Sequence, residues 1–299
     1  MKRKIIKTVL FAVLIFDLSS CTSSKHSEGN VALVDGVAIS SDTYLKELDF
    51  YQKYYSQKFG EGYLDQEVER GKTNKDILEK DLVDSLVKDQ VMVNDLKANN
   101  IKVDDNVASS LRKDLEEKLG GKDSLKANVK ALGTDENKFN QVLYNDSIRK
   151  QHYNYYLSHN DIKDSEILEY YKANEKYHKE YKYDVLVFDD QNEANKIYKN
   201  LKSPADFKSY LNKPVQNYEV INSDFVYNDD PLLKESGVLE KDEISDIFKH
   251  EDKYMILMIN SYNENENDLL INVKDIYLKE KYEDYLNKLV KKSKIRLFV

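Results

Sequence analysis

The stretch YDVLVF, residues 183–188, decides the fold that this sequence predicts. Its β-branched and aliphatic residues favour a short buried strand. A second run of this kind, KYMILMI, follows at residues 253–259. Between the two runs lie a helical pattern at residues 192–211 and a loop-rich stretch with Pro214 and Pro231. Strand, helix, loop and strand in this order predict a small α+β domain over residues 181–264.

Helical patterns fill the sequence before this domain. In residues 77–100, Leu78, Leu82 and Leu86 fall near one helical face. The tripeptide Thr134-Asp135-Glu136 is typical of the start of another long helix, which we expect to continue to about Leu157. With the shorter patterns around them, these segments predict an α-rich domain with short connections.

The two ends of the chain are predicted to meet. Residues 269–292 have helical spacing, and IRLFV, residues 295–299, is expected to form a final strand. We expect this strand to pair with residues 31–34, because close termini permit the insertion of one domain into another. The fold class is therefore α+β, with a mostly helical domain over residues 31–180 that is completed by residues 265–299.

The N-terminus has the parts of a secretory signal peptide. Three basic residues follow Met1, an apolar stretch covers about residues 8–16, and small residues precede Cys21. The apolar stretch is too short to span a bilayer as a helix of the mature protein, which needs about 20 residues. We therefore predict a signal peptide at residues 1–20.

Cys21 is the only cysteine of the chain, and a polar linker follows it. The tetrapeptide Leu18-Ser19-Ser20-Cys21 resembles the bacterial lipobox, in which the cysteine becomes the first mature residue and carries acyl chains. The resemblance implies a lipidated linker at residues 21–30 and a lipoprotein anchored to the bacterial cell membrane, since two or more acyl chains bind stably. An ordinary secreted protein is the alternative.

The composition bounds the classes of partner. The formal net charge of the 299 residues is −8, and an acidic surface argues against nucleic acid and against a polybasic membrane patch. One third of the residues are charged, yet 23 tyrosines and 10 phenylalanines favour a folded chain.

No motif of a common enzyme class is present. The five histidines are scattered and lack the spacing of metal ligands, and neither a phosphate-binding loop nor a nucleophile elbow occurs. The sequence therefore predicts no metal site and no cofactor.

Two groups of tyrosines are candidates for binding other polypeptides. Their members are Tyr51, Tyr54 and Tyr55 in one predicted helix and Tyr153, Tyr155 and Tyr156 in another. Tyrosine is amphipathic and enriched at interfaces, so an aromatic cleft for unfolded clients is one interpretation. Ordinary half-buried helix packing is the other, and the sequence leaves both open.

Four stretches resemble the PrsA/SurA family of extracytoplasmic foldases. VALVDGVAISSDTYLKEL (31–48) is similar to the opening segment of the family, and YEDYLNKLVKKSKIRLFV (282–299) to its C-terminal helix and strand. DSEILEYYKANEKYHKEYKYDVLVF (164–188) and LEKDEISDIFKHEDKYMILMI (239–259) are similar to the start and end of its parvulin-type prolyl isomerase domain. The resemblance implies a SurA-like N-terminal chaperone domain with an inserted parvulin-like domain.

The parvulin-like segment departs from the family at its pocket. Asp184 and Met255 stand where the family has histidines, and Lys213 aligns with its aspartate or cysteine. The glycine-rich loop beside the pocket is also missing, since Gly237 is the only glycine after Gly133. The resemblance thus implies a degenerate catalytic site and leaves isomerase activity uncertain.

These observations predict a membrane-anchored extracytoplasmic chaperone that assists the folding of exported proteins. Its partners would be unfolded or exported polypeptides and, through acylated Cys21, a lipid membrane. The alternatives are an active peptidyl-prolyl cis-trans isomerase and a surface lipoprotein that binds a host or envelope ligand. The sequence does not indicate an oligomeric state.

Overall fold

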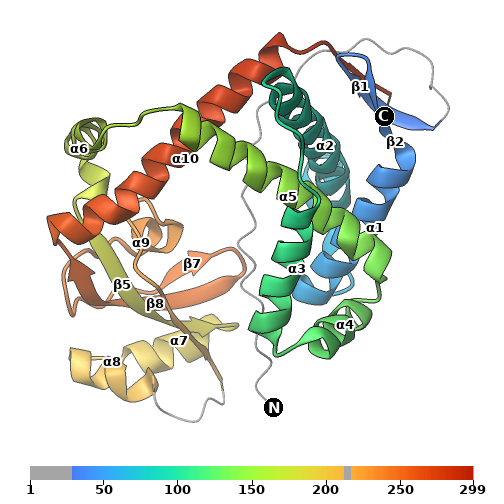
Figure 1. Cartoon of the computed structure of the whole chain (residues 1–299). Coiled ribbons are helices and arrows are strands. Elements are labelled where there is room, and N and C mark those ends of the chain that lie inside the picture. Colours follow the sequence, from blue (N-terminus) through green and yellow to red (C-terminus); the bar gives the residue numbers. More distant parts are fainter. Residues whose placement is uncertain (1–28, 212–216, 299) are drawn as a thin grey trace. The chain divides into compact units, whose positions relative to one another are not determined.

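The computed structural model describes residues 29–211 and 217–298, which form two compact units (Figure 1). Within these residues the first unit consists of 29–161 and 282–298, and the second of 162–281. Helices dominate and strands are the minority, which confirms the α+β class. The predicted signal peptide, Cys21 and Lys213 lie outside the described residues.

The boundaries of the units differ from the predicted domain limits of 180/181 and 264/265. Helix α6 (Asp164–Ala173) and the first part of helix α10 (Glu266–Lys292) belong to the second unit. The reason is packing: Ile167 and Tyr171 of α6 share a buried cluster with Leu269 and Val273 of α10. The apolar face of each helix is covered by the other.

The first unit contains two small sheets and most of the long helices. Its elements are β1 (Asn30–Val34), β2 (Val37–Ser40), α1 (Ser41–Phe59), η1 (Tyr63–Asp65), β3 (Glu67–Glu69), β4 (Lys72–Thr73), α2 (Asn74–Ala98), α3 (Asn106–Leu119), α4 (Lys122–Ala131), α5 (Glu136–His159), the end of α10 and β9 (Ile295–Leu297). Helix α5 packs against α1, α2 and α3 (Figure 1). Among the described residues, no helix has both the length and the hydropathy needed to cross a membrane.

The ends of the chain meet in an antiparallel sheet of order β2-β1-β9. Ala32 pairs with Leu297 and Val34 pairs with Ile295, which confirms the predicted pairing of the two terminal strands. Val31 and Val34 pack in one cluster with side chains of α2 and the end of α10. Burial of this shared apolar cluster stabilises the pairing of β9 with β1.

Local signals fix where the long helices begin. Thr73 and Asp76 form a reciprocal capping box at the start of α2, and the Asp135 side chain accepts from the Asn137 and Lys138 amides at the start of α5. These bonds satisfy amide groups that have no partner within the helix, and each such cap is worth about 1 kcal/mol. The predicted helix start at Thr134-Asp135-Glu136 is confirmed, with Asp135 as the N-cap residue.

The second unit is built on a four-stranded sheet. Its elements are α6, η2 (Glu175–Tyr177), β5 (Glu180–Phe188), α7 (Gln191–Tyr198), α8 (Pro204–Leu211), β6 (Glu219–Asn222), α9 (Pro231–Ser236), β7 (Phe248–His250), β8 (Lys253–Asn263) and the first part of α10. The strand order is β6-β5-β8-β7, and all neighbours are antiparallel.

Both faces of this sheet are covered. Val185 and Val187 of β5 pack toward Leu233 of α9, whereas Leu186 and Phe188 pack in a second cluster with α7 and α8. Because successive side chains of a strand point to opposite faces, a strand buried on both sides is an unbroken apolar run. Residues 185–188 and 255–259, within the two predicted stretches, both have this property.

Candidate functional site

A partly exposed row of aromatic side chains lies at the end of α1. We call Tyr54, Tyr55, Phe59 and Tyr63 the aromatic ridge. The ring of Tyr55 stacks on that of Phe59 with centroids 6.0 Å apart, and the centroids of Phe59 and Tyr63 are 4.6 Å apart. The side chain of Phe59 is 49% exposed and the three tyrosines are half-buried, so the ridge presents mainly the Phe59 ring to a partner.

The turn after α1 holds Tyr63 against Phe59. Helix α1 ends at Gly60, whose φ of 102° favours glycine over other residues. The Tyr63 amide then donates to the Gly60 carbonyl (3.1 Å), and the Asn74 side-chain amide donates to the Tyr63 carbonyl (3.0 Å). Leu64 is buried next to these bonds. These hydrogen bonds to the main chain of Tyr63 hold its ring in place against Phe59.

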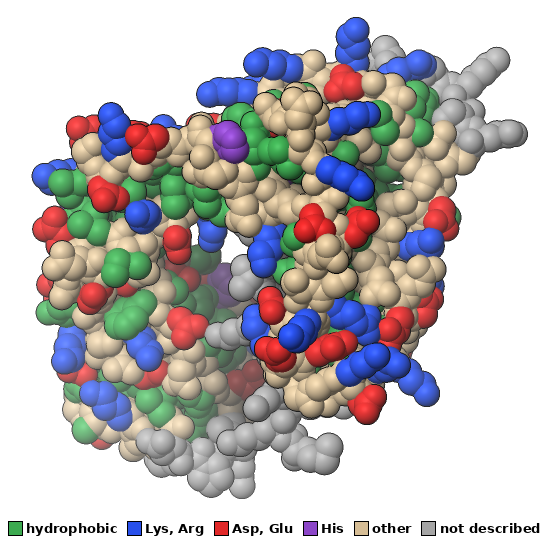
Figure 2. Space-filling view, viewed as in Figure 1, with side chains coloured by type: hydrophobic (Ala, Val, Ile, Leu, Met, Phe, Trp, Pro, Cys, Tyr) green, Lys and Arg blue, Asp and Glu red, His purple; other side chains and the backbone are tan. Residues whose placement is uncertain are grey.

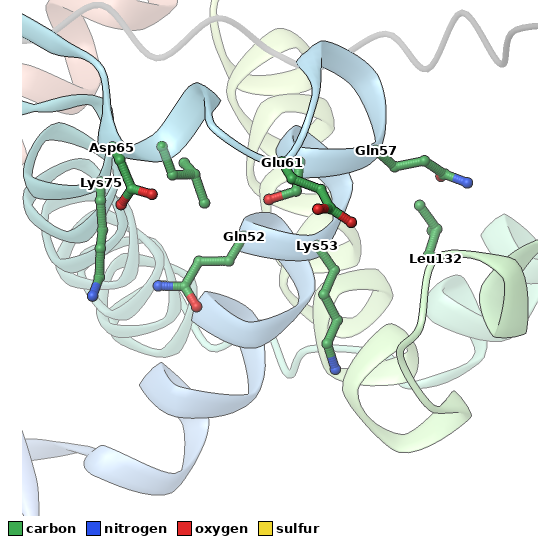
Figure 3. Close-up of a pocket in the computed structure, with 9 residues that line it drawn as sticks. Gln52, Lys53, Gln57, Glu61, Asp65, Lys75 and Leu132 are labelled. Carbon is green, nitrogen blue, oxygen red and sulfur yellow. The ribbon is translucent and has the colours of Figure 1, made fainter.

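A pocket of about 510 Å³, lined mainly by polar and charged residues, lies along α1 and the η1 segment (Figure 3). Its walls come from α1, the η1 segment, the start of α2 and the end of α4: Gln52, Lys53, Ser56, Gln57, Glu61, Leu64, Asp65, Lys75 and Leu132. Figure 3 shows the two glutamines with two acidic and two basic side chains around an open space. Such a lining can both donate to and accept from a peptide main chain.

The ridge and the pocket offer different chemistry on one helix. The rings offer apolar area and a π face, and Lys58 lies with its Nζ 4.8 Å from the Phe59 centroid. The pocket offers amide, ammonium and carboxylate groups of mixed sign. This combination suits an extended, unfolded segment, whose apolar side chains and unpaired main-chain groups both need partners.

The remaining candidate tyrosines are mostly packed inside the first unit. Tyr51 contacts two core clusters, and burial raises the pKa of its phenol. The Tyr153 ring meets Tyr282 at 4.9 Å, and Tyr156 is buried between Tyr282 and Tyr285. The Tyr156 side chain is only 6% exposed, which favours the interpretation of helix packing for this residue.

Tyr155 is less buried than Tyr156 but does not belong to the aromatic ridge. Its side chain is half-buried, and its ring lies 4.3 Å from the ring of His159 near the end of α5. The structure therefore places Tyr54 and Tyr55 on the aromatic ridge and does not bring the tyrosines of α5 to the same surface.

A buried polar network joins α1 to α2 and α5. Arg149 of α5 donates through Nε and Nη2 to the two carboxylate oxygens of Asp89, at 2.8 and 2.7 Å, and through Nη1 to Asp146. Glu47 of α1 accepts a hydrogen bond from the Asn145 side chain. This network fixes the helix that carries the ridge.

Glu47 is the least satisfied member of the network. Its side chain is 1% exposed, and Oε2 has no hydrogen-bond partner among the described residues. Burial, together with the nearby charge of Asp89, raises the pKa of the Glu47 carboxyl to about 8, although Arg149 acts in the opposite direction. Glu47 is therefore largely protonated at neutral pH.

Asp184 and Met255 are not brought together by the fold. Asp184 lies on β5 opposite Met258 and on the face of Leu186, whereas Met255 lies on β8 in the cluster of the other face. Both side chains are buried. The Asp184 carboxylate accepts from the side-chain amides of Asn222 (2.6 Å) and Asn260 (3.1 Å). These contacts make it a satisfied structural carboxylate.

Sequence reasoning missed two parts of this arrangement. Phe59 and Tyr63 belong to the ridge, and the four-residue spacing of Tyr55 and Phe59 was the available signal for the first of them. Glu47 and Asp89 look like surface charges in the sequence. Their signal was position, since Asp89 is three residues from both Leu86 and Met92 on the buried face of α2.

Comparison with known proteins places the chain in a family. A model of the SurA-like N-terminal domain matches residues 1–169, which is more than half of the chain. The chain therefore belongs to the SurA-like N-terminal domain family, and the predicted resemblance is confirmed. No curated protein sequence matches it.

Solved structures with similarity to the chain include bacterial foldases. A SurA-like chaperone of Campylobacter jejuni is 16% identical, with 90% of this chain and 98% of that chain covered and a TM-score of 0.42. The foldase protein PrsA of Lactococcus lactis is 14% identical, with 90% and 94% covered and a TM-score of 0.40. The peptidylprolyl isomerase PrsA of Bacillus anthracis is 17% identical, with 70% and 94% covered and a TM-score of 0.32.

Proposed function

We propose that this protein is a lipid-anchored extracytoplasmic chaperone that holds exported polypeptides while they fold. The observation that carries the proposal is the aromatic ridge beside a polar pocket on a SurA-like helical unit. Cys21 is the proposed site of acylation, and the second unit is proposed to be a parvulin-like domain that lacks the family histidines. Binding is non-covalent and needs no cofactor.

The physical basis is reversible burial of apolar surface. An unfolded client exposes aliphatic and aromatic side chains, and contact with the rings of Tyr55, Phe59 and Tyr63 removes area from water on both partners. The mixed charges of the pocket satisfy main-chain groups of many sequences and favour none of them strongly. Such a surface binds weakly and broadly, as a holding chaperone requires.

Replacement of Phe59 by serine is expected to weaken client binding by about 5–10-fold, because the variant loses roughly 1–1.4 kcal/mol of apolar contact. The measurement is the concentration of chain that halves the aggregation of a chemically denatured client. The matched control is Leu45→Ser, since Leu45 is 58% exposed on the same helix but outside the ridge. Equal loss in both variants, or no suppression by the unaltered chain, would count against the ridge as the client site.

The second unit is expected to show no prolyl isomerase activity. Neither Asp184 nor Met255 offers an imidazole, and the Asp184 carboxylate already has two amide partners. With a proline-containing tetrapeptide, the rate should equal that of buffer, where isomerisation takes tens to hundreds of seconds. A parvulin added to the same assay is the positive control. A rate above buffer that scales with the concentration of the chain would establish the enzyme instead.

A further inference from the structure

The end of α10 and strand β9 form a strongly basic part of an acidic protein. Residues 285–299 contain five basic side chains and no aspartate or glutamate, although the whole chain has a formal charge of −8. We call Lys288, Lys291, Lys292, Lys294 and Arg296 the basic end. The negative net charge of the whole chain argues against a polybasic patch. The charges are unevenly distributed, however, and the basic end is locally positive.

The lysines of the basic end share one side of the helix. At 100° per residue, Lys288, Lys291 and Lys292 fall within about 100° of one another, opposite the buried side chains of Leu286 and Val290. All three are exposed. Asp284, one turn earlier, is the acidic residue nearest to them on this side of α10.

Strand β9 continues the same exposed surface. Ile295 and Leu297 pack toward the core, so the alternation of the strand leaves Arg296 exposed between them. Within residues 29–211 and 217–298, none of the ammonium groups of Lys288, Lys291, Lys292 and Lys294 pairs with a carboxylate, although the main-chain amide of Lys294 donates to the Asp35 carboxylate at 2.8 Å. Figure 2 shows Lys and Arg side chains gathered over this end of the first unit. The charges of the four lysines are available to an outside partner.

The place of the basic end in the fold identifies that partner. Strand β9 pairs with β1, and the Phe298 amide donates to the Val31 carbonyl at 2.9 Å. The chain enters β1 at Asn30, nine residues after Cys21. A linker of that length spans at most about 30 Å when fully extended. Acylation of Cys21 would therefore keep the basic end close to the bilayer at a high effective concentration.

We propose that the basic end docks the first unit onto the anionic lipid headgroups of the bilayer to which the chain is tethered. The inference rests on the proposed acylation of Cys21 and concerns a separate surface from the aromatic ridge. Each cation that reaches an anionic bilayer strengthens binding by about fivefold. Docking through β9 and the end of α10 orients the unit, which a flexible linker alone cannot do.

The test uses the full acylated chain on vesicles of phosphatidylcholine, with and without phosphatidylglycerol. Lysines are acetylated briefly and quantified by mass spectrometry. Lys288, Lys291, Lys292 and Lys294 should react about fivefold more slowly on the anionic vesicles, and added salt should remove the difference. Lys113 and Lys126, exposed on α3 and α4, should react equally on both.

Charge reversal at Lys291, Lys292 and Lys294 to glutamate should abolish the protection of Lys288. The matched control reverses Lys113, Lys118 and Lys126, which changes the net charge equally, and should leave the protection intact. Equal labelling of the unaltered chain on both kinds of vesicle overturns the docking proposal. If soluble polyphosphate protects these lysines from acetylation on neutral vesicles, the basic end binds phosphate in general, and the proposal that it binds lipid headgroups is wrong. Failure of the chain to float with phosphatidylcholine vesicles overturns the tether instead.

Discussion

Replacement of Glu47 by glutamine is expected to stabilise the first unit increasingly as the pH rises from about 5 to 8. The Glu47 carboxyl is buried, its pKa is raised from 4.5 to about 8, and one of its oxygens has no hydrogen-bond partner. In the unfolded chain the same carboxyl ionises at its ordinary pKa. Between the two pKa values the native state therefore binds a proton that the unfolded state has released.

The sign of the effect follows from this difference in bound protons. Stability falls with rising pH wherever the native state binds more protons than the unfolded state. The contribution of Glu47 is thus fully present below about pH 4.5, decreases as pH rises, and is lost above about pH 8. At about 1.4 kcal/mol per pKa unit, the total change is about 3–5 kcal/mol. Glutamine has the same shape and no charge, so the variant should lack this decrease.

The measurement is chemical denaturation of the unaltered chain and of Glu47→Gln at several pH values between 4 and 9, followed by circular dichroism. The difference in unfolding free energy should start near zero and level off above about pH 8. Amide hydrogen exchange in α1 assigns the effect to the first unit. Glu117→Gln is the matched control, since Glu117 is exposed on α3. A difference that does not change with pH would show that the pKa of Glu47 is not raised in the folded protein.

The strands that define the fold could be predicted because burial on both faces makes their sequences apolar throughout. Val185 and Leu186 pack on opposite sides of the sheet, so residues 185–188 are an unbroken apolar run, and Asp184 before them is buried with two amide partners. The pairing of residues 31–34 with the final strand was predictable for a related reason, since two short apolar strands at the chain ends each need a neighbour. The strand predictions depend only on the local pattern, whereas the pairing also depends on the expectation that an inserted domain leaves the chain ends close together.

The limits of the units could not be predicted from such patterns. Helix α6 has a clear helical spacing, but the spacing does not say whether Ile167 packs against α5 or against Leu269 of α10. The candidate site shows the same limit. Tyr55 was recognisable as a candidate, whereas Tyr63 joins the ridge only because a turn at Gly60 folds it back onto Phe59. Contacts between segments that are separate in sequence decide both cases.

Removal of the Arg149 guanidinium is expected to destabilise the first unit by about 3–5 kcal/mol, as for other buried pairs that lose one partner. Arg149 donates two hydrogen bonds to Asp89 and one to the Ser85 hydroxyl at 2.8 Å. The Asp89 side chain is 6% exposed. The variant Arg149→Met would leave the Asp89 carboxylate without a cation in a site that already contains the Glu47 carboxyl.

A double variant separates the loss of an interaction from the creation of an unpaired charge. Replacement of Asp89 by leucine in the Arg149→Met background should recover most of the lost stability, because apolar side chains replace a buried pair at little net cost. Arg112→Met serves as the control, since its partners Glu116 and Glu136 are partly exposed and such pairs contribute about 0–1 kcal/mol. The measurement is the free energy of unfolding of all three variants, obtained from chemical denaturation at pH 7. If Arg149→Met costs no more than Arg112→Met, the network does not hold α1, α2 and α5 together, and the ridge at the end of α1 must be positioned by apolar packing alone.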